Sequence, residues 1–335
     1  MRTEDFDYAL PPELIATQPV TPRDASRLMV YRRSDQSISH HRINELPELL
    51  SADDTLIFNN SRVIPARLRA HDSKGRDMEV MLLEPKGDRS WRALAKPGKR
   101  IKTRFSVSLK DGTELMLERT PEDEFLAHFP PGSDFYSWLE TVGEPPIPPY
   151  FKRKADLSDR DRYQTVYAET PGSVAAPTAG LHFTPQLLNS LASAGIEQHF
   201  VTLHVGYGTF APISVKELSE HRMHFESYEI EPGTFAAIQR KHMEGKRIIA
   251  VGTTSLRTLE SIPLFGPAGR TNLFITPGYH FAFVGGLLTN FHLPQSSLYV
   301  LVAALIGLNE VRRCYHEAIQ HHYRFYSYGD AMLVL

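Results

Sequence analysis

The sequence has little cysteine and no long apolar segment, and both shortages exclude classes of protein. Its 335 residues include a single cysteine, Cys314, which excludes an intrachain disulfide, a Cys-x-x-Cys zinc or redox site and an iron–sulfur cluster. The longest apolar run covers 11 residues, 298–308, whereas a membrane-spanning helix needs about 20. The start of the chain, MRTEDFDYAL, is acidic where a secretory signal would be basic and then apolar. We therefore expect a soluble, cytoplasmic protein.

An excess of charge of one sign is also missing. The 37 lysines and arginines nearly balance the 39 aspartates and glutamates, which gives a net charge of -2. A nucleic acid would therefore have to be bound by local basic patches, because the whole protein carries no attractive field. What is present is an ordinary globular balance of 41% hydrophobic and 23% charged residues, over a length typical of about two domains.

One segment, from Arg62 to Pro131, differs in pattern from the rest. It consists of short alternating runs separated by turns rich in Gly, Lys and Asp, and Asp111-Gly112 between two such runs predicts a hairpin. About six strands at this spacing predict a small antiparallel barrel or sandwich. The proline-rich stretch 144–149 then ends the segment. We expect residues 62–149 to form an inserted, mainly β domain without the catalytic pocket, and residues 1–61 to join residues 150–335.

Beyond residue 150 the pattern changes to helices alternating with strands, which predicts an α/β body. Thr184 as N-cap and Pro185 at the first helical position begin a helix that Gly195 should end. We expect further helices at 234–244, 297–306 and 310–322, and strands at 198–205, 247–251 and 271–276.

Two glycine-rich loops are candidates for ligand contact. Gly206 and Gly208 fit the GxGxxG/A pattern, but Pro212 makes a helix start there unfavourable, so we expect a tight loop and no dinucleotide fold. The segment Gly252–Ser255 follows an apolar strand and begins a helical pattern, which is typical of an anion site at a helix N-terminus. It lacks the lysine of a nucleotide phosphate loop. The alternative is simple capping of the helix by Thr254 or Ser255.

Several histidines could carry chemistry. His182 follows the small residues Ser173–Gly180, which leave room for a flat ligand, although an isolated histidine is more often a core or loop residue. His221, His224 and Glu226 could bring metal ligands together. A third firm ligand is missing there, so we expect no metal.

Basic residues gather in two places. Five cations lie within positions 96–104, and three more occupy 152–154. Such runs are usually solvated surface, but in a slightly acidic chain they favour contact with a phosphate backbone. The candidate RNA contacts are Lys96, Lys99, Arg100, Lys102, Arg104, Lys152, Arg153 and Lys154.

Motifs along the whole chain resemble one family. They are FDYALPPELIA (6–16), RDASRL (23–28), FNNSRVIPARL (58–68), YQTVYA (163–168), GSVAAPTAGLHFT (172–184), TLHVGYGTF (202–210), HRMHFE (221–226), VGTTSLRTLE (251–260), LTNFHLP (288–294) and YRFYSYGDAML (323–333). In these motifs the sequence resembles the S-adenosylmethionine:tRNA ribosyltransferase-isomerases of queuosine biosynthesis. One departure is Gly285-Gly286, where the family usually has an aspartate.

The resemblance implies a fold and a reaction. The fold is an incomplete α/β barrel-like body with an inserted small antiparallel β-barrel. The reaction transfers and isomerises the ribosyl moiety of S-adenosylmethionine onto 7-aminomethyl-7-deazaguanine in a tRNA anticodon, giving epoxyqueuosine, adenine and methionine. S-adenosylmethionine is then a cosubstrate, and the partner is a tRNA carrying the 7-deazaguanine precursor. We expect a monomer. Two alternatives are a non-catalytic RNA-binding protein and a ribosyltransferase acting on a free base.

The chemistry of a sulfonium ribose favours histidines as base and acid, because they titrate near neutral pH. The candidates are His182 and His204, then His292, with Glu226 or Asp330 as an orienting carboxylate. We expect His182 and His204 to line one pocket; which of them is base or acid is left open. The candidate substrate-binding residues are Ser173, Thr178, Gly180, Gly206, Gly208, Gly252, Thr253, Thr254, Ser255, Arg257 and Asn290.

Overall fold

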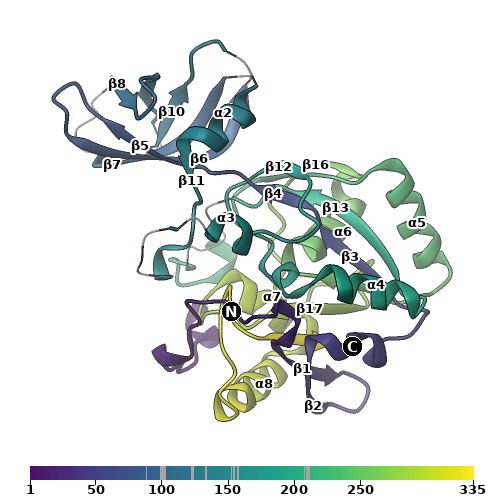
Figure 1. Cartoon of the computed structure of the whole chain (residues 1–335). Coiled ribbons are helices and arrows are strands. Elements are labelled where there is room, and N and C mark those ends of the chain that lie inside the picture. The colour runs from purple at the N-terminus through teal and green to yellow at the C-terminus, as the bar shows by residue number, and fades with distance from the viewer. Residues whose placement is uncertain are drawn as a thin grey trace.

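Two β-sheets organise the chain, and each has its own hydrophobic core (Figure 1). The computed structural model describes residues 1–87, 89–98, 103–121, 124–132, 134–151, 153, 155–156, 158–206, 208 and 212–335. One sheet is large and mixed, and the other closes into a small antiparallel barrel that stands to one side of it in Figure 1. The expected fold class, an α/β body with an inserted barrel, is confirmed.

The larger sheet has nine strands. Their spatial order is β16 (Ala268–Thr271), β14 (Glu226–Glu229), β13 (Glu197–Leu203), β3 (Thr55–Asn59), β15 (Ile248–Val251), β17 (Gly286–Asn290), β18 (Ala331–Val334), β1 (Arg27–Arg32) and β2 (Ser37–Arg42). The neighbours β13, β3, β15 and β17 run parallel. Every residue of β3, β15 and β17 is buried, as expected for parallel strands covered on both faces.

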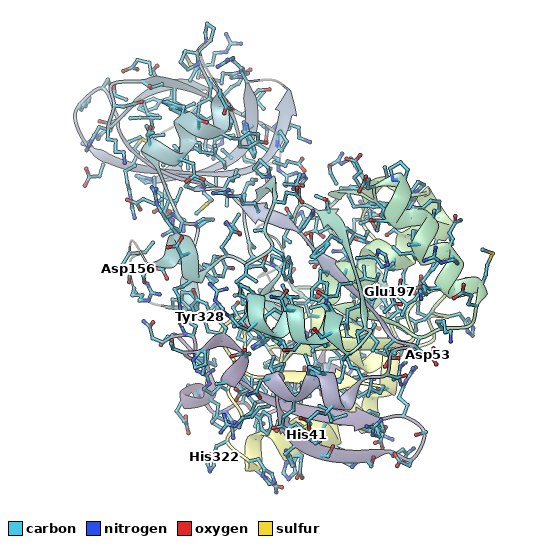
Figure 2. All side chains as sticks on the ribbon, turned by 45° about the vertical axis from the view of Figure 1, so that its right-hand side comes forward. His41, Asp53, Asp156, Glu197, His322 and Tyr328 are labelled. Carbon is cyan, nitrogen blue, oxygen red and sulfur yellow. The ribbon has the colours of Figure 1, made fainter. Side chains whose placement is uncertain are left out.

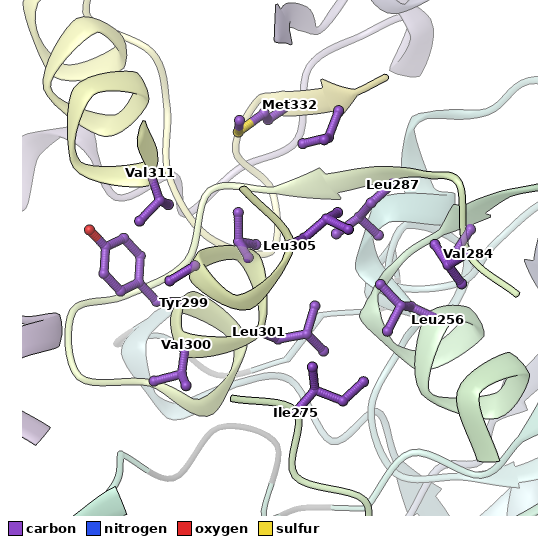
Figure 3. Packing of buried hydrophobic residues seen from close by; sticks show 14 of the residues in the cluster. Leu256, Ile275, Val284, Leu287, Tyr299, Val300, Leu301, Leu305, Val311 and Met332 are labelled. Atoms are coloured by element: carbon purple, nitrogen blue, oxygen red, sulfur yellow. The ribbon is translucent and has the colours of Figure 1, made fainter. Parts of the chain in front are cut away.

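Helices cover both faces of this sheet. One face packs against α5 (Pro232–Met243), α6 (Thr253–Phe265), α7 (Ser297–Ile306) and α8 (Leu308–Gln320), in the core that Figure 3 shows around Leu287 and Leu301. The other face packs against α1 (Leu46–Leu49) and α4 (Pro185–Ser193). A short α3 (Asp159–Arg162) and the 3-10 helices η1 (Thr3–Phe6), η2 (Pro12–Leu14), η3 (Arg23–Ala25), η4 (Ile43–Glu45), η6 (Pro149–Phe151), η7 (Thr178–His182) and η9 (Leu218–Glu220) complete the described helices. None of the helices in the described part of the chain is long and apolar enough to span a bilayer.

Local signals in the body correspond closely to its elements. The Thr184 hydroxyl accepts a hydrogen bond from the Leu187 amide at 3.1 Å and so caps α4 as predicted. The strand expected at 271–276 is wrong, because β16 ends at Thr271. Beyond Thr271, side chains form the hydrogen bonds with backbone amides and carbonyls that a neighbouring strand would otherwise form. The Leu273 amide donates to the Thr271 hydroxyl at 3.2 Å, and the Leu273 carbonyl accepts from Arg257 Nε at 3.0 Å.

The smaller sheet forms the inserted barrel. Its strands pair in the order β5 (Arg67–His71), β6 (Asp77–Gly87), β7 (Ser90–Lys96), β10 (Phe125–His128), β9 (Glu114–Arg119) and β8 (Arg104–Leu109), and β8 pairs with β5 to close the ring. The short β11 (Gly143–Glu144) pairs with β5 outside the ring. Apolar residues that alternate along these strands point inward around Trp91, and this alternation is the signal that predicted the barrel. One helix, α2 (Phe135–Val142), was not expected in this segment.

The body and the barrel are joined by the connecting backbone segments and also by an ion pair. Between β3 and β5 the chain passes through β4 (Ser61–Val63), which pairs in parallel with β12 (Thr170–Ser173). Away from this junction, Arg270 on β16 pairs with Glu84 on β6 at 3.3 Å. The barrel strands lie within residues 67–144, and the domain limits 62 and 149 stay predictions.

Candidate active site

Polar residues gather at one edge of the large sheet, where its parallel strands end. β3 ends at Asn59, β17 ends at Asn290, and His204 and Gly252 directly follow β13 and β15. Because these strands are neighbours and run parallel, their carboxyl ends meet at one edge. In α/β folds, ligands bind at this edge of the sheet. The topology therefore brings together residues that lie far apart in the sequence.

The first cavity at this edge is open, and together with the solvent at its mouth it measures about 520 Å³. Its walls come from Ala176–Ala179, the Gly252–Thr254 turn, Asn290, His292 and Tyr326. The turn forms the N-terminus of α6, where no side chain of the described residues supplies a capping hydrogen bond. Unpaired amides and the helix dipole at such an end favour an anion. The simple-capping alternative fails for Ser255, whose hydroxyl donates to the Val251 carbonyl at 2.9 Å.

A second, larger hollow of about 940 Å³ lies between the body and the barrel. The body contributes His204, Gly206, Gly208, His224, Glu226 and their neighbours, and the barrel contributes Leu83, Glu84, Pro85, Arg92, Leu94 and Glu124. The insert was expected not to hold the catalytic pocket, yet it supplies part of the wall of this hollow. The reason is tertiary: β6 and β7 of the barrel face the end of β13, and no local sequence pattern encodes that contact.

His204 is held by a chain of hydroxyl groups. Its Nδ1 lies 2.9 Å from the Ser61 hydroxyl oxygen, which lies 2.6 Å from that of Ser173. The Ser173 hydroxyl in turn accepts a hydrogen bond from the Val205 amide at 2.8 Å. Burial lowers the pKa of His204 below its ordinary value of 6.5, an effect that Glu229 opposes. With Nδ1 engaged, Nε2 is the ring nitrogen left for a ligand in the second cavity.

His292 is fixed just as firmly, in the wall of the first cavity. Its Nε2 lies 2.9 Å from the Thr289 hydroxyl, and its amide donates to the Tyr315 hydroxyl at 3.0 Å. The Tyr8 hydroxyl donates to its carbonyl. Burial lowers the pKa of His292 to about 3, so its imidazole is neutral at neutral pH. His292 is therefore a hydrogen-bonding wall residue of this cavity.

His182 does not share a cavity with His204. Only 3% of its surface is exposed, and it lines neither of the two cavities. Burial lowers its pKa to about 4, although Asp330 opposes the shift. The expected single pocket for His182 and His204 is therefore corrected. His182 lies in η7 behind the first cavity, and it is His292 that lines that cavity.

Two further predicted residues have structural partners. A side chain on Gly180 would place its Cβ 2.1 Å from the Tyr167 hydroxyl, so the glycine makes room for a buried tyrosine. Asp330 accepts hydrogen bonds from Arg27 Nε at 3.2 Å and from the Arg324 amide at 2.8 Å. Its carboxylate thus anchors the N-terminal strand β1 to the C-terminal segment.

Glu226 and Arg257 form a buried ion pair that links β14 to α6. Glu226 Oε1 also accepts a hydrogen bond from the Gly206 amide at 2.9 Å, while Arg257 Nε donates to the Leu273 carbonyl at 3.0 Å. The pair therefore fixes the loop that carries Gly206 against the start of the α6 helix. Glu226 orients the wall of the second cavity through the backbone.

Comparison with known protein families gives a match over almost the whole sequence. The profile described as queuosine biosynthesis protein matches residues 3–334. The chain belongs to this family. S-adenosylmethionine:tRNA ribosyltransferase-isomerases of Desulfitobacterium hafniense and Thermosynechococcus vestitus are 46% and 47% identical to it. These comparisons cover 100% of this chain and 100% of the first relative, and 98% of this chain and 95% of the second.

A solved structure from the same family has a similar fold. The crystal structure of an S-adenosylmethionine tRNA ribosyltransferase from Thermotoga maritima matches with a TM-score of 0.57 and 36% sequence identity. The match covers 99% of this chain and 100% of that chain. The likeness therefore extends over the body and the barrel together.

Two residues without a predicted role, Asn59 and Ser61, hold this edge of the sheet together. Asn59 Nδ2 donates to the Leu203 carbonyl at 3.0 Å and lies 3.3 Å from the Thr254 hydroxyl. Its Oδ1 accepts from the amides of Ser61 and Leu203, both at 3.1 Å. One side chain thus ties together the ends of β3 and β13 and the start of α6. The available signal was two asparagines and a serine directly after the apolar run of β3.

The remaining candidates are placed as follows. His221 and His224 line a hollow of about 410 Å³ beside Gly206, Gly208 and Glu226, and Glu226 is engaged by Arg257. The GxGxxG/A pattern is followed by no helix in the described residues 212–217. The roles of Gly206 and Gly208 as ligand contacts stay predictions.

The basic residues are described only in part. Lys96 is exposed at the end of β7, and Arg104 pairs with Glu118 at 3.2 Å. Arg153 forms a two-pronged pair with Asp159 at 2.6 and 2.7 Å. Lys99, Arg100, Lys102, Lys152 and Lys154 lie outside the described residues.

Proposed function

We propose that the chain transfers and isomerises the ribosyl moiety of S-adenosylmethionine onto 7-aminomethyl-7-deazaguanine in a tRNA anticodon. The products are epoxyqueuosine, adenine and methionine. The observation that carries the proposal is the position of His204. It lines the second cavity, and the next residue, Val205, lines the first cavity together with the uncapped N-terminus of α6. The names of the full-length relatives, which are S-adenosylmethionine:tRNA ribosyltransferase-isomerases, support it.

S-adenosylmethionine fits the first cavity by its chemistry. Its methionine carboxylate is an anion, and the N-terminus of α6 offers the backbone amides of Thr253 and Thr254 as partners. The small residues Ala176 and Ala179 leave a smooth wall against which an adenosine can lie. Asn290 Nδ2 already donates to the Tyr326 carbonyl at 3.0 Å, so Oδ1 is the atom that could accept a hydrogen bond from the nucleoside.

We assign the proton transfer to His204, which lines the second cavity directly before Val205 of the first, so the ribose of S-adenosylmethionine must reach from the first cavity toward the second. The positive sulfonium acidifies the neighbouring ribose 5′ carbon, so a neutral base within hydrogen-bond reach can remove its proton. Because the pKa of His204 is lowered, its imidazole is neutral near pH 7, and in the tautomer in which Nδ1 donates to the Ser61 hydroxyl oxygen, Nε2 is free to accept that proton. The protonated ring can then donate the proton to adenine as it leaves. His182 and His292 take no proton near pH 7, because burial lowers the pKa of each to about 4 and about 3.

The tRNA base approaches from the barrel side. The second cavity is open between body and barrel, and Arg92 and Glu124 of the barrel face His204 and Gly206 across it. The basic run 96–104 leads from β7 of the barrel and would contact the phosphate backbone. A single chain lines both cavities, so a monomer suffices, and the cytoplasm is where a tRNA substrate is met.

S-adenosylmethionine labelled in its ribose distinguishes the candidate functions. The chain is incubated with tRNA carrying the precursor base, with unmodified tRNA, and with the free base. The proposal requires label in the precursor tRNA alone and one adenine released per ribosyl group transferred. Label in the free base would instead establish a free-base ribosyltransferase. Binding of tRNA without release of adenine would establish a non-catalytic RNA-binding protein.

A further inference from the structure

A cluster of metal-ligating side chains lies far from the two cavities. It comprises His40 on β2, Glu317 on α8 and His321, which directly follows α8. One ligand atom of each residue lies within 4.8 Å of the others. Figure 2 shows their sequence neighbours His41 and His322 at the end of the body opposite the barrel. None of the three residues lines either cavity, so the cluster has no part in the proposed reaction.

Both imidazoles direct the same nitrogen at the same carboxylate. His321 Nε2 lies 3.0 Å from Glu317 Oε1, and His40 Nε2 lies 3.5 Å from that oxygen. An ordinary ion pair one helical turn apart explains the contact of His321 with Glu317. It does not explain why His40, from a different element, points its Nε2 to the same atom. The two rings stack with centroids 4.4 Å apart, so their nitrogens sit side by side.

The orientation of His40 is fixed from behind. Its Nδ1 lies 2.9 Å from the hydroxyl of Tyr323, a residue that is 1% exposed. Histidine ligands of metals characteristically engage their second nitrogen in such a bond, which sets the ring direction and tautomer. The Tyr323 ring is itself held by the Arg27 guanidinium, 4.4 Å from the ring centroid. The site therefore has a ligand set and a rigid partner that positions one ligand.

We propose that His40, Glu317 and His321 bind a divalent transition-metal ion, with Zn²⁺ as the best match. Two imidazoles and one carboxylate are the ligand types that suit Zn²⁺, Co²⁺ and Ni²⁺, with water in the fourth position. Ligand atoms at about 2.0–2.2 Å from a tetrahedral ion lie about 3.3 Å apart, close to the separations from Glu317 already present. The side chain of His321 is 52% exposed, so it can rotate toward the fixed ring of His40 to complete the site.

The ion would join two parts of the body. His40 belongs to the β1–β2 hairpin near the start of the chain, and Glu317 and His321 belong to the last helix. An ion that binds only the folded chain stabilises it by mass action. Arg27 donates to the His321 carbonyl at 2.7 Å, and this nearby cation should keep the affinity moderate.

Titration of the full chain with Zn²⁺ after treatment with chelator tests the site. Calorimetry should give one site per chain, Co²⁺ should give the visible absorption of a tetrahedral complex, and Zn²⁺ should raise the melting temperature. His321→Ala and Glu317→Gln should abolish all three effects, and Tyr323→Phe should weaken binding about 10–100-fold. His316→Ala, an exposed histidine on the same helix, is the matched control and should bind normally. Unchanged binding in His321→Ala, equal loss in His316→Ala, or no binding to the wild type would overturn the proposal.

Discussion

At the scale of single residues, the histidines of the sheet edge differ in what their surroundings allow them to do. His204 combines an anchored Nδ1 with a place in a cavity wall, whereas His182 is enclosed. His204→Ala should lower the rate of ribosyl transfer by about 10²–10⁴-fold, because it removes the proposed base. Single-turnover assays measure this loss, and the melting temperature should stay near that of the wild type because His204 is only half-buried.

Companion variants separate a catalytic role from a structural one. Ser61→Ala leaves the ring in place but removes the partner of Nδ1, so kcat should fall by less than in His204→Ala while KM for S-adenosylmethionine stays constant. Ser190→Ala, an exposed serine on α4, is the control and should leave kcat unchanged. If the rate of His204→Ala merely follows its folded fraction, the assignment of His204 as base fails.

The two enclosed histidines predict how stability depends on pH. The pKa values of His182 and His292 in the folded chain are about 4 and about 3, below the ordinary value of 6.5. Below pH 6.5 these two histidines bind protons in the unfolded chain but stay neutral in the folded chain. Their contribution to the free energy of unfolding is therefore fully present above pH 6.5 and is lost as the pH falls toward 4. Each histidine should contribute ~1.4 kcal/mol per pH unit in this range. Denaturant unfolding at pH 7.5, 6.0 and 5.0 measures the slope.

Replacing one of these residues provides the check. His292→Gln retains a side chain that can bond Thr289 and cannot titrate, so its unfolding free energy should fall less steeply below pH 6.5. His316→Gln, at an exposed position, should keep the wild-type slope. A slope identical in wild type and His292→Gln would assign the acid sensitivity to other groups.

Candidate site residues could be selected from the sequence more easily than their burial or hydrogen-bond partners could be predicted. His204 and Gly252 could be selected because each directly follows an apolar run and lies beside small residues. The burial of His182 could not be read, since it depends on how η7 packs in the folded chain. Ser61 was overlooked because its partner, His204, lies 143 positions away in the sequence.

At the scale of elements, the ion pair between β14 and α6 connects the cavity wall to the core. Arg257→Met should destabilise the chain by about 3–5 kcal/mol, because it leaves the buried Glu226 carboxylate without its cation. Chemical denaturation measures the change. Arg240→Met on α5 is the control, since its side chain is 58% exposed and its loss should cost little. Equal stability of the two variants would contradict this role for the pair.

Elements with a local pattern were predicted, and those without one were not. Most barrel strands alternate between buried and more exposed residues, as β7 does, and α4 begins with Thr184-Pro185, so both could be predicted from the sequence. Helix α2 was missed because its aromatic and β-branched residues have low helix propensity, although the Asp134 carboxylate accepts from the Tyr136 amide at 3.1 Å as a cap. The order of the parallel strands has no local signature.

At the scale of the whole molecule, the barrel adds a wall and the basic run to the body. Replacing Lys99, Arg100 and Lys102 together by alanine should weaken tRNA binding, because phosphate contacts and their counterion release are lost. Each lost contact should reduce the log–log salt slope by about 1. Filter binding from low to moderate salt measures the slope.

The cosubstrate supplies the control for this variant. Affinity for S-adenosylmethionine should not change, because the first cavity is lined by the body alone. An unchanged tRNA affinity would assign the run 99–102 to ordinary solvated surface. A loss of both affinities would point to misfolding of the barrel.

The position of β18 has a consequence for how the chain is made. The barrel strands all lie within residues 67–144, so the barrel can fold while synthesis continues. The large sheet is different, because β18 (Ala331–Val334) lies between β17 and β1 and pairs with both. At roughly 5–20 residues per second, a ribosome needs tens of seconds to pass from β1 to β18 but only a few seconds to pass from β17 to β18. Until β18 is made, the edge of β1 that it will cover stays unpaired for most of synthesis and that of β17 for the last seconds, so the nascent body should need protection from aggregation.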